Sequence, residues 1–469
     1  MSASLRQAAG RDRGTPPRGE IKALTGLRAV AATWVVLYHV TWLSAAYVDQ
    51  VSFLRPVLEA GWTGVELFFV LSGFVIARSY LQTMGSRWRT GAALRFVYNR
   101  LARVWPAYAT VTVIAFLWLL VIGELGWDVD VVAPHPDATV LQLGSQLTMT
   151  QMWGAETLTG QSFNPPGWSI SAEWLAYLAF PFLALLLWPL RRLAPVVLLA
   201  LSCLAMSPLF FNAYVNGLPD VATSWVMRIT CCFAAGILAC LAIRDVVPSR
   251  RSEQFGLVLS VTSITGVVLI TFWAQWRESL TPGDFAGVAT ILYPLLIVGL
   301  TLSDRGPARV LATGPLLYGG RVSYCLYLVH FVVMDVVVTS FWQDESRRGT
   351  VTPAIALAVP LVVLGSLALA AALHHGVEEP GRRRALSLLE RAAARRGRSA
   401  SRSSLPRHAE TPLPRPRPTV EASTSRLTLD RLGPVRRPLP GEHPAAPLAR
   451  RVAAGEAPTP APVGAPSAQ

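Results

Sequence analysis

Long apolar stretches recur along most of the chain and are separated by short polar segments. Each stretch runs for about 17 to 25 residues, the length that a helix needs to cross the core of a bilayer. Strict alternation of apolar and polar residues is absent, so the stretches indicate helices rather than strands of a barrel. The sequence therefore predicts an all-α, polytopic integral membrane protein with about ten transmembrane helices, over residues 24–46, 60–80, 103–123, 168–190, 194–211, 222–243, 255–276, 285–302, 316–342 and 352–377.

Basic residues divide unevenly between alternate connections. They gather in the N-terminal arm, in residues 78–103 and in the later connections on the same side, whereas residues 124–167 contain no Lys or Arg and carry acidic residues instead. Cytoplasmic loops of membrane proteins carry an excess of Lys and Arg. We therefore expect a multi-pass protein of the plasma membrane with both termini in the cytoplasm, and an ordered cap formed by 124–167 on the opposite side.

Composition changes this picture only at the C-terminus. The net charge is +14, but the basic residues lie in short loops and the tail, so nothing predicts nucleic-acid binding. Residues 381–469 are rich in Pro, Arg, Ala and Ser and are expected to be disordered. Their first part, Arg382 to Arg398, has two interpretations, a solvated tail or a basic helix on anionic lipid. The expected division is a disordered arm (1–20), a transmembrane domain (21–380) and this tail.

The five cysteines all lie in apolar stretches. Their spacing matches no metal-ligand pattern, and a disulfide framework is not expected. We therefore predict no metal site.

The first span carries two ionisable residues, Arg28 and His39. Eleven residues of helix place them on one face, separated by about 16 Å along the axis. Arg28 has a simple alternative role, in which it extends to the headgroups at the membrane surface. An imidazole inside the bilayer is costly and usually faces a cavity or a partner, so His39 is a candidate functional residue.

The second span places Glu66 at a depth similar to that of His39. A carboxylate beside an imidazole fixes its tautomer and raises its basicity, so we expect Glu66 to orient His39. Further along this span, Ser72 and Gly73 are small enough to permit close helix packing.

Three more groups of polar residues stand out. Arg100 and Arg103 share a helix face at the cytoplasmic start of a span, where they would bind phosphates or act as ordinary positive-inside charges. Trp168, Ser171 and Glu173 lie at the outer start of the next span, and capping does not explain Glu173 because Ile170 stands three residues before it. A stripe in a late span includes Tyr324 and His330, for which packing is the alternative role.

Taken in order over about 21–380, these motifs resemble those of the acyltransferase family 3 membrane proteins, which O-acetylate sugars of the cell envelope. The matching segments are Arg28 with His39, Phe68–Phe74, Arg100–Pro106, Trp168–Glu173, Ser323–His330 and Val377–Pro380. Two departures are Glu66, where the family often has Asp, and an additional glutamate before Pro380.

The resemblance implies transfer of an acyl group, expected to be acetyl, from cytoplasmic acyl-CoA to a hydroxyl of an envelope carbohydrate or secreted small molecule, with no cofactor besides this co-substrate. His39 would act as general base or briefly carry the acyl group, with Glu66 orienting it. The expected donor-binding residues are Arg28, Arg100 and Arg103, the acceptor-binding residues Trp168, Ser171 and Glu173, and the supporting residues Ser72, Gly73, Tyr324 and His330.

Two other classes of function remain open at this point. Ionisable residues inside a membrane also mark proton relays, as in a transporter or a flippase of lipid-linked sugars. Against that class, the chain has no repeated halves and no matched pair of broken spans. A scaffold that displays the basic tail would explain the tail but not His39.

Overall fold

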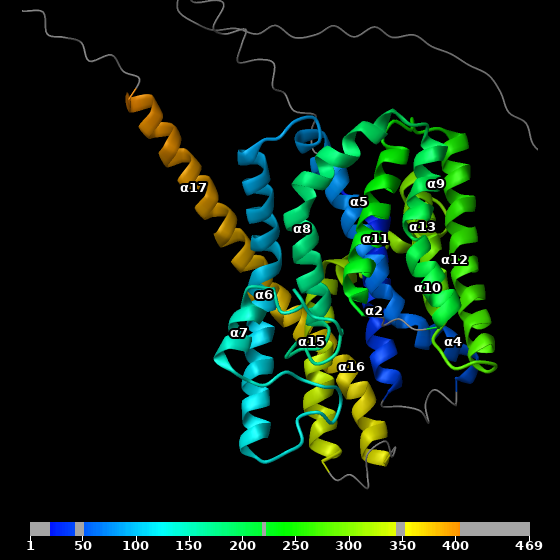
Figure 1. Cartoon of the computed structure of the whole chain (residues 1–469), viewed down its shortest axis with the longest axis vertical. Coiled ribbons are helices and arrows are strands. Elements are labelled where there is room, and N and C mark those ends of the chain that lie inside the picture. The colour runs from blue at the N-terminus through cyan, green and yellow to red at the C-terminus, as the bar shows by residue number, and fades with distance from the viewer. Residues whose placement is uncertain (1–18, 43–50, 218–221, 344–351, 404–469) are drawn as a thin grey trace, which may run out of the picture. The chain divides into compact units, whose positions relative to one another are not determined.

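The computed structural model describes residues 19–42, 51–217, 222–343 and 352–403. Within these ranges the protein consists of helices and loops, without strands (Figure 1). Nine helical segments of this described part are long and apolar enough to cross a membrane, which confirms the predicted fold class. They contain α2 (Lys22–Thr41), α5 (Gly64–Met84), α6 (Thr90–Glu124), α8 (Gly167–Leu187), α9 (Pro195–Ala205) with α10 (Ser207–Asn216), α11 (Ser224–Ile243), α12 (Arg250–Glu278), α15 (Gly314–Phe341), and α16 (Pro353–Leu373) with α17 (Glu379–Ser403).

The tenth expected span, 285–302, is a shorter apolar segment of mixed helix type. It begins as the 3₁₀ helix η4 (Ala286–Leu292) and continues as α13 (Tyr293–Leu302). A 3₁₀ helix rises about 2.0 Å per residue and an α-helix about 1.5 Å, so the segment extends over roughly 29 Å. That length matches the hydrocarbon core of a bilayer, about 30 Å thick.

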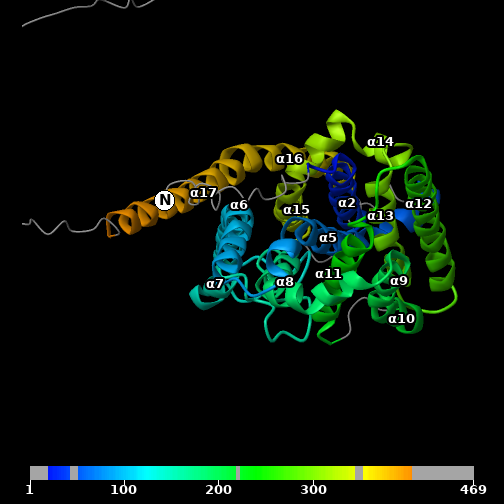
Figure 2. The same ribbon diagram turned by 90° about the horizontal axis from the view of Figure 1, so that it is seen from above.

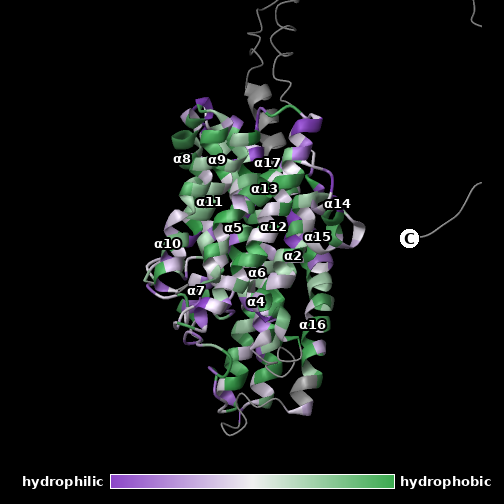
Figure 3. Cartoon of the chain, turned by 90° about the vertical axis from the view of Figure 1, so that its right-hand side faces the viewer, coloured by the Kyte–Doolittle hydropathy of each residue, from purple (hydrophilic) through white to green (hydrophobic). Residues whose placement is uncertain are grey.

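The outward surface of the bundle is strongly apolar. Large side chains such as Leu186, Val196 and Leu361 are more than half exposed. Figure 3 shows hydrophobic residues along the helices and hydrophilic residues mainly at helix ends and in loops. Such a surface suits lipid, which needs no polar partners from the helices that face it.

Close helix packing holds the centre of the bundle together. α5 packs against α11, and α2 packs against α15 (Figures 1 and 2). A Cβ atom at Gly73 would collide with the carbonyl of Phe233, and one at Gly236 with the carbonyl of Val70. The two glycines therefore let the backbones of α5 and α11 approach closely, the role predicted for Gly73.

The bundle has two ends, named here by α2. The Lys22 end is where α2 begins, and the loop end is where α2 finishes and residues 125–166 lie (Figure 1). That segment contains α7 (Val140–Leu147) and buries Met149, Met152 and Phe163. It forms the expected ordered cap.

The C-terminal part of the described chain differs from the expected tail. A π-helical turn, η6 (His374–Glu378), joins α16 to α17, so the chain stays helical to Ser403. The hydroxyl of Tyr98 donates to the carbonyl of Ala385 at 2.7 Å and attaches the start of α17 to α6. The first part of the segment expected to be disordered is thus helical, while residues 404–469 lie outside the described residues.

Candidate active site

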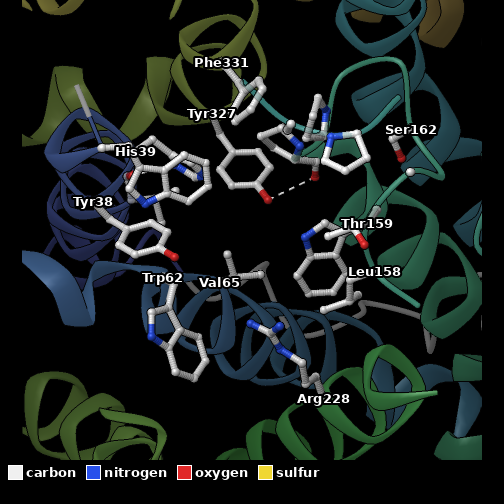
Figure 4. A pocket seen from close by; sticks show the side chains of 18 residues that line it. Tyr38, His39, Trp62, Val65, Leu158, Thr159, Ser162, Arg228, Tyr327 and Phe331 are labelled. Atoms are coloured by element: carbon white, nitrogen blue, oxygen red, sulfur yellow. Dashed lines mark hydrogen bonds between the residues drawn. The ribbon is translucent and has the colours of Figure 1, made fainter. Parts of the chain in front are cut away.

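Two cavities lie inside the bundle, and most of the predicted site residues line one or the other. The arginine cavity has a volume of about 120 Å³ and is lined by Arg28, Ser72, Arg100, Arg103, Glu173 and Tyr324, among others. The histidine cavity has a volume of about 190 Å³ and is lined by Tyr38, His39, Trp42, Trp168, Arg228 and Phe331, among others (Figure 4). The sequence motifs therefore converge on two adjoining spaces.

The two cavities adjoin and share two lining residues. Val65 of α5 and Tyr327 of α15 line both. The hydroxyl of Tyr327 lies 2.8 Å from Ser169 Oγ and donates to the carbonyl of Pro166 at 3.1 Å. These hydrogen bonds fix the ring of Tyr327, and Figure 4 shows the ring facing the histidine cavity with a hydrogen bond from its hydroxyl.

His39 is held by a backbone carbonyl and by a second histidine. Its Nδ1 atom lies 2.9 Å from the carbonyl oxygen of Val35 and 3.3 Å from Nε2 of His330. His330 Nδ1 lies 3.1 Å from the carbonyl of Leu326. His330 is buried, at 2% exposure. The predicted supporting residue His330 thus lies directly against His39.

These contacts indicate which nitrogen of His39 carries the hydrogen and which keeps a lone pair. A carbonyl only accepts hydrogen bonds, so Nδ1 of each neutral ring carries the hydrogen. The His39 Nδ1–H then points at the carbonyl of Val35 and at the lone pair of His330 Nε2. The Nε2 atom of His39 is left with a lone pair, on a ring that lines the cavity. This is the tautomer that a general base needs.

The structure corrects the expected role of Glu66. Its carboxylate forms an ion pair with Nε of Arg228 instead of contacting His39, and it is 1% exposed. Glu66 lines neither cavity, whereas its neighbour Val65 lines both. Successive residues of a helix point about 100° apart, so depth in the membrane alone did not reveal which way the carboxylate faces. His330 occupies the place expected for Glu66.

Arg228 of α11 is a site residue that the motifs missed. It is 5% exposed and lines the histidine cavity. Its guanidinium carbon lies 5.2 Å from the ring centre of Trp62 and 4.6 Å from that of Trp168, in cation–π geometry. A charged residue inside an apolar span, one turn after its start, was the signal that would have identified it.

Three guanidinium groups face the arginine cavity. The Nε atoms of Arg28 and Arg100 are buried and have no hydrogen-bond partner among the described residues. Arg100 also lies over the rings of Tyr80 and Phe96, at 5.7 and 5.9 Å from their centres. Buried polar groups normally find partners. Unsatisfied cationic donors that line a cavity indicate a site for an anionic group.

Arg103 differs from the other two because it has a carboxylate partner. It forms an ion pair with Glu378, which is fully buried. Arg103 therefore pairs with Glu378, the first of the two glutamates before Pro380. The second, Glu379, binds Arg382 and Arg383 of its own helix.

Cys325, His374 and Glu378 lie close enough together to hold a metal ion. His374 Nδ1 is 2.6 Å and Cys325 Sγ is 3.1 Å from Glu378 Oε2. The other side of the carboxylate binds the Arg103 guanidinium, whose positive charge opposes a second cation. The group therefore fits a hydrogen-bonded anchor between helices better than a metal centre.

The three predicted acceptor-binding residues do not line a common cavity. Trp168 lines the histidine cavity, but Glu173 lines the arginine cavity, where it interacts electrostatically with Arg28. Ser171 is completely buried, donates to the carbonyl of Met149 at 2.8 Å and accepts from the amide of Met152 at 3.3 Å. Its hydroxyl therefore fastens the cap to α8 and is not available to an acceptor.

The remaining supporting residues lie at the arginine cavity. Ser72 Oγ is 3.4 Å from the hydroxyl of Tyr177. Tyr324 donates to the carbonyl of Val104 at 2.9 Å, and its ring lies 5.9 Å from the guanidinium of Arg103. Both residues shape the cavity wall.

Comparisons with known proteins identify the family of the chain. A family model described as an acyltransferase domain matches residues 21–373. The "Acyltransferase MdmB" of Streptomyces mycarofaciens is 27% identical over 79% of this chain and 95% of its own. The "Putative membrane-bound transacylase BcsY" of Komagataeibacter xylinus is 27% identical over 75% and 82%. The "Peptidoglycan O-acetyltransferase OatA" of Listeria monocytogenes is 23% identical over 68% of this chain and 50% of its own.

No solved structure shows a significant match to the chain. The family model extends over most of the bundle, from the residue before α2 to the end of α16. The chain therefore belongs to acyltransferase family 3 and is a membrane acyltransferase.

Proposed function

We propose that the protein transfers an acyl group, most simply acetyl, from acyl-CoA that enters at the Lys22 end to a hydroxyl of a carbohydrate or small molecule that enters at the loop end. The observation that carries this proposal is the pair of adjoining cavities. One is lined by arginines whose buried Nε atoms have no hydrogen-bond partner among the described residues, the other is lined by His39, and Val65 and Tyr327 line both.

The distribution of charge supports a direction for the reaction. Arginines are abundant in the arm and connections at the Lys22 end, whereas residues 124–167 at the loop end contain no Lys or Arg. By the positive-inside rule the Lys22 end faces the cytoplasm, where acyl-CoA is made. Both termini are then cytoplasmic, in the plasma membrane, and the acceptor is outside the cytoplasm.

Arg28 and Arg100 are the proposed donor-binding residues because each has a buried nitrogen that finds no partner in the part of the chain that the structure describes. A guanidinium binds phosphate or a thioester carbonyl through several N–H groups at once. Arg103 is already neutralised by Glu378, so it orders the cavity and adds less to donor affinity.

His39 Nε2 is the proposed general base. It takes the proton from the acceptor hydroxyl, whose oxygen attacks the thioester carbonyl carbon. The C–S bond then breaks, and the proton on His39 passes to the sulfur of CoA. The products are an ester and free CoA, and no redox partner is needed. A variant of this route transfers the acyl group first to His39 Nε2 and then to the hydroxyl.

The experiment that tests the proposal compares wild type with His39→Ala and His39→Gln in proteoliposomes. Radiolabelled acetyl-CoA is the donor, and a panel of peptidoglycan fragments, surface oligosaccharides and macrolides is screened for the acceptor. General base catalysis contributes typically 10² to 10⁴-fold, so both variants should lose at least about 100-fold in kcat. Transfer at a near wild-type rate would refute the role of His39.

A pulse with labelled acetyl-CoA alone distinguishes the two routes. Label that remains on wild-type protein after quenching, and is absent from His39→Ala, supports the acyl-histidine route. Protein without label supports direct attack by the hydroxyl.

A further inference from the structure

Arg228 places a positive charge in a cavity whose other lining residues are mostly apolar or aromatic. It enters from α11, while His39 enters from α2 (Figure 4). The guanidinium points into the cavity that the ring of His39 also lines. A cation is costly in such a place unless it is paired or has a function.

Glu66 fixes Arg228 from behind the cavity wall. The carboxylate of Glu66 forms an ion pair with Nε of Arg228, and Glu66 itself does not line the cavity. The ring of Trp62 and the ring of Trp168 lie against the guanidinium. The group is thus held in one orientation before any substrate binds, which is the condition for effective electrostatic catalysis.

We propose that Arg228 is a catalytic residue that donates hydrogen bonds to the oxyanion formed during acyl transfer. The inference rests on the proposed function. When His39 removes the proton from the acceptor hydroxyl and the hydroxyl oxygen bonds to the acyl carbon, the carbonyl π electrons move onto the carbonyl oxygen. Arg228 stabilises that negative charge until the C–S bond breaks and the electrons return to the carbonyl.

Geometry and environment both favour this role. A guanidinium presents several N–H donors in a planar fork, and Glu66 uses the Nε position. A fixed cation among apolar side chains acts on a developing anion more strongly than it would in solvent. Loss of one fixed donor to an oxyanion typically lowers kcat by about 10²–10³-fold.

A purely structural role makes a different prediction. If Arg228 only neutralises Glu66, its removal leaves a buried unpaired carboxylate that destabilises the fold. Removal of both charges should then restore the enzyme. Glu66→Gln combined with Arg228→Gln replaces the ion pair by two neutral amides of similar size.

The experiment measures kcat, the KM of acetyl-CoA and of the chosen acceptor, and the thermal unfolding midpoint for Glu66→Gln, Arg228→Gln, Arg228→Lys and the double variant. We expect the double variant to unfold close to wild type and to lose at least about 100-fold in kcat, with both KM values within a few-fold. Arg228→Lys keeps the positive charge but lacks the planar set of N–H donors, so its kcat should lie between those of wild type and Arg228→Gln.

A matched control is the pair of Arg55 and Glu59, which are 2.8 Å apart on the exposed surface of α4 (Arg55–Glu59). Arg55→Gln and Glu59→Gln together make the same charge change outside both cavities.

A double variant of Glu66 and Arg228 that transfers acyl groups within about fivefold of wild type, while His39→Ala is inactive, overturns this inference alone. If His39→Ala remains active, the proposed role of His39 fails, whatever the Arg228 variants show. If Arg228→Gln unfolds, the double variant still decides between the two roles.

Discussion

The two cavities are built from different chemistry although they share a wall. Among the described residues, three guanidinium groups line the arginine cavity, and two of these have buried nitrogens without partners there. The histidine cavity contains one guanidinium, which is already paired, and a histidine whose hydrogen bonds fix its tautomer. Unsatisfied donors suit the binding of a ligand that brings its own charge. Satisfied and fixed groups suit chemistry, because their orientation does not depend on the ligand.

The largest expected effect lies on the binding side of this comparison. Arg28→Gln combined with Arg100→Gln should raise the KM of acetyl-CoA about 100-fold, since charged hydrogen bonds contribute about 1.5–3 kcal/mol each. kcat at saturating donor should change much less. Steady-state kinetics in proteoliposomes checks this prediction. A fall in kcat with an unchanged donor KM would show that the arginine cavity takes part in catalysis. The division between a binding cavity and a catalytic cavity would then be wrong.

Trp168→Ala tests whether the histidine cavity receives the acceptor. Loss of a large aromatic surface should raise the acceptor KM about tenfold, which corresponds to about 1.4 kcal/mol. The donor KM should stay within about twofold of wild type. Kinetics with each substrate varied in turn provides the measurement. An equal rise in both KM values would place Trp168 in a common binding space.

His330→Leu removes the lone pair that faces His39 Nδ1. A hydrogen bond of this kind contributes about 1 kcal/mol, so kcat should fall about fivefold. His330→Gln offers an amide oxygen as acceptor and should recover part of the rate. His375→Leu is the control, because this histidine contacts Tyr318 and lines neither cavity. Equal losses in the Leu and Gln variants would mean that His330 acts only by packing.

Ser171→Ala should have the smallest effect on kinetics. Its two backbone hydrogen bonds attach the cap, so their loss should lower the free energy of unfolding by about 1–3 kcal/mol. Both KM values should remain near wild type. Thermal unfolding and kinetics of the same sample check the two parts. A selective rise in acceptor KM would return Ser171 to the acceptor site.

Helix positions and depth could be predicted from the sequence, since both follow from the lengths of the apolar stretches. The positions of Arg28, His39, Arg100 and Trp168 in cavities agree with that prediction. The sequence did not predict how each helix is rotated about its own axis. It also did not predict which helices are neighbours. Trp168 and Glu173 are five residues apart, so they point about 140° apart and line different cavities.

The sequence also could not show which charged residues pair with one another. Glu66 and Arg228 are 162 positions apart, and nothing local to either residue indicates the other. The ion pair exists because Gly73 and Gly236 bring α5 and α11 together, so it depends on packing along the whole crossing. A search for every charge inside an apolar span, followed by a search for its opposite, would have suggested the pair.

The wall shared by the two cavities has a consequence for the cell as well as for the enzyme. A membrane must remain impermeable to protons and ions if it is to sustain an electrochemical gradient. In this protein Val65 and Tyr327, which line both cavities, form part of that seal. Under the proposed function each acyl group passes between the cavities beside these two side chains, and energy conservation then requires the passage to close after every turnover.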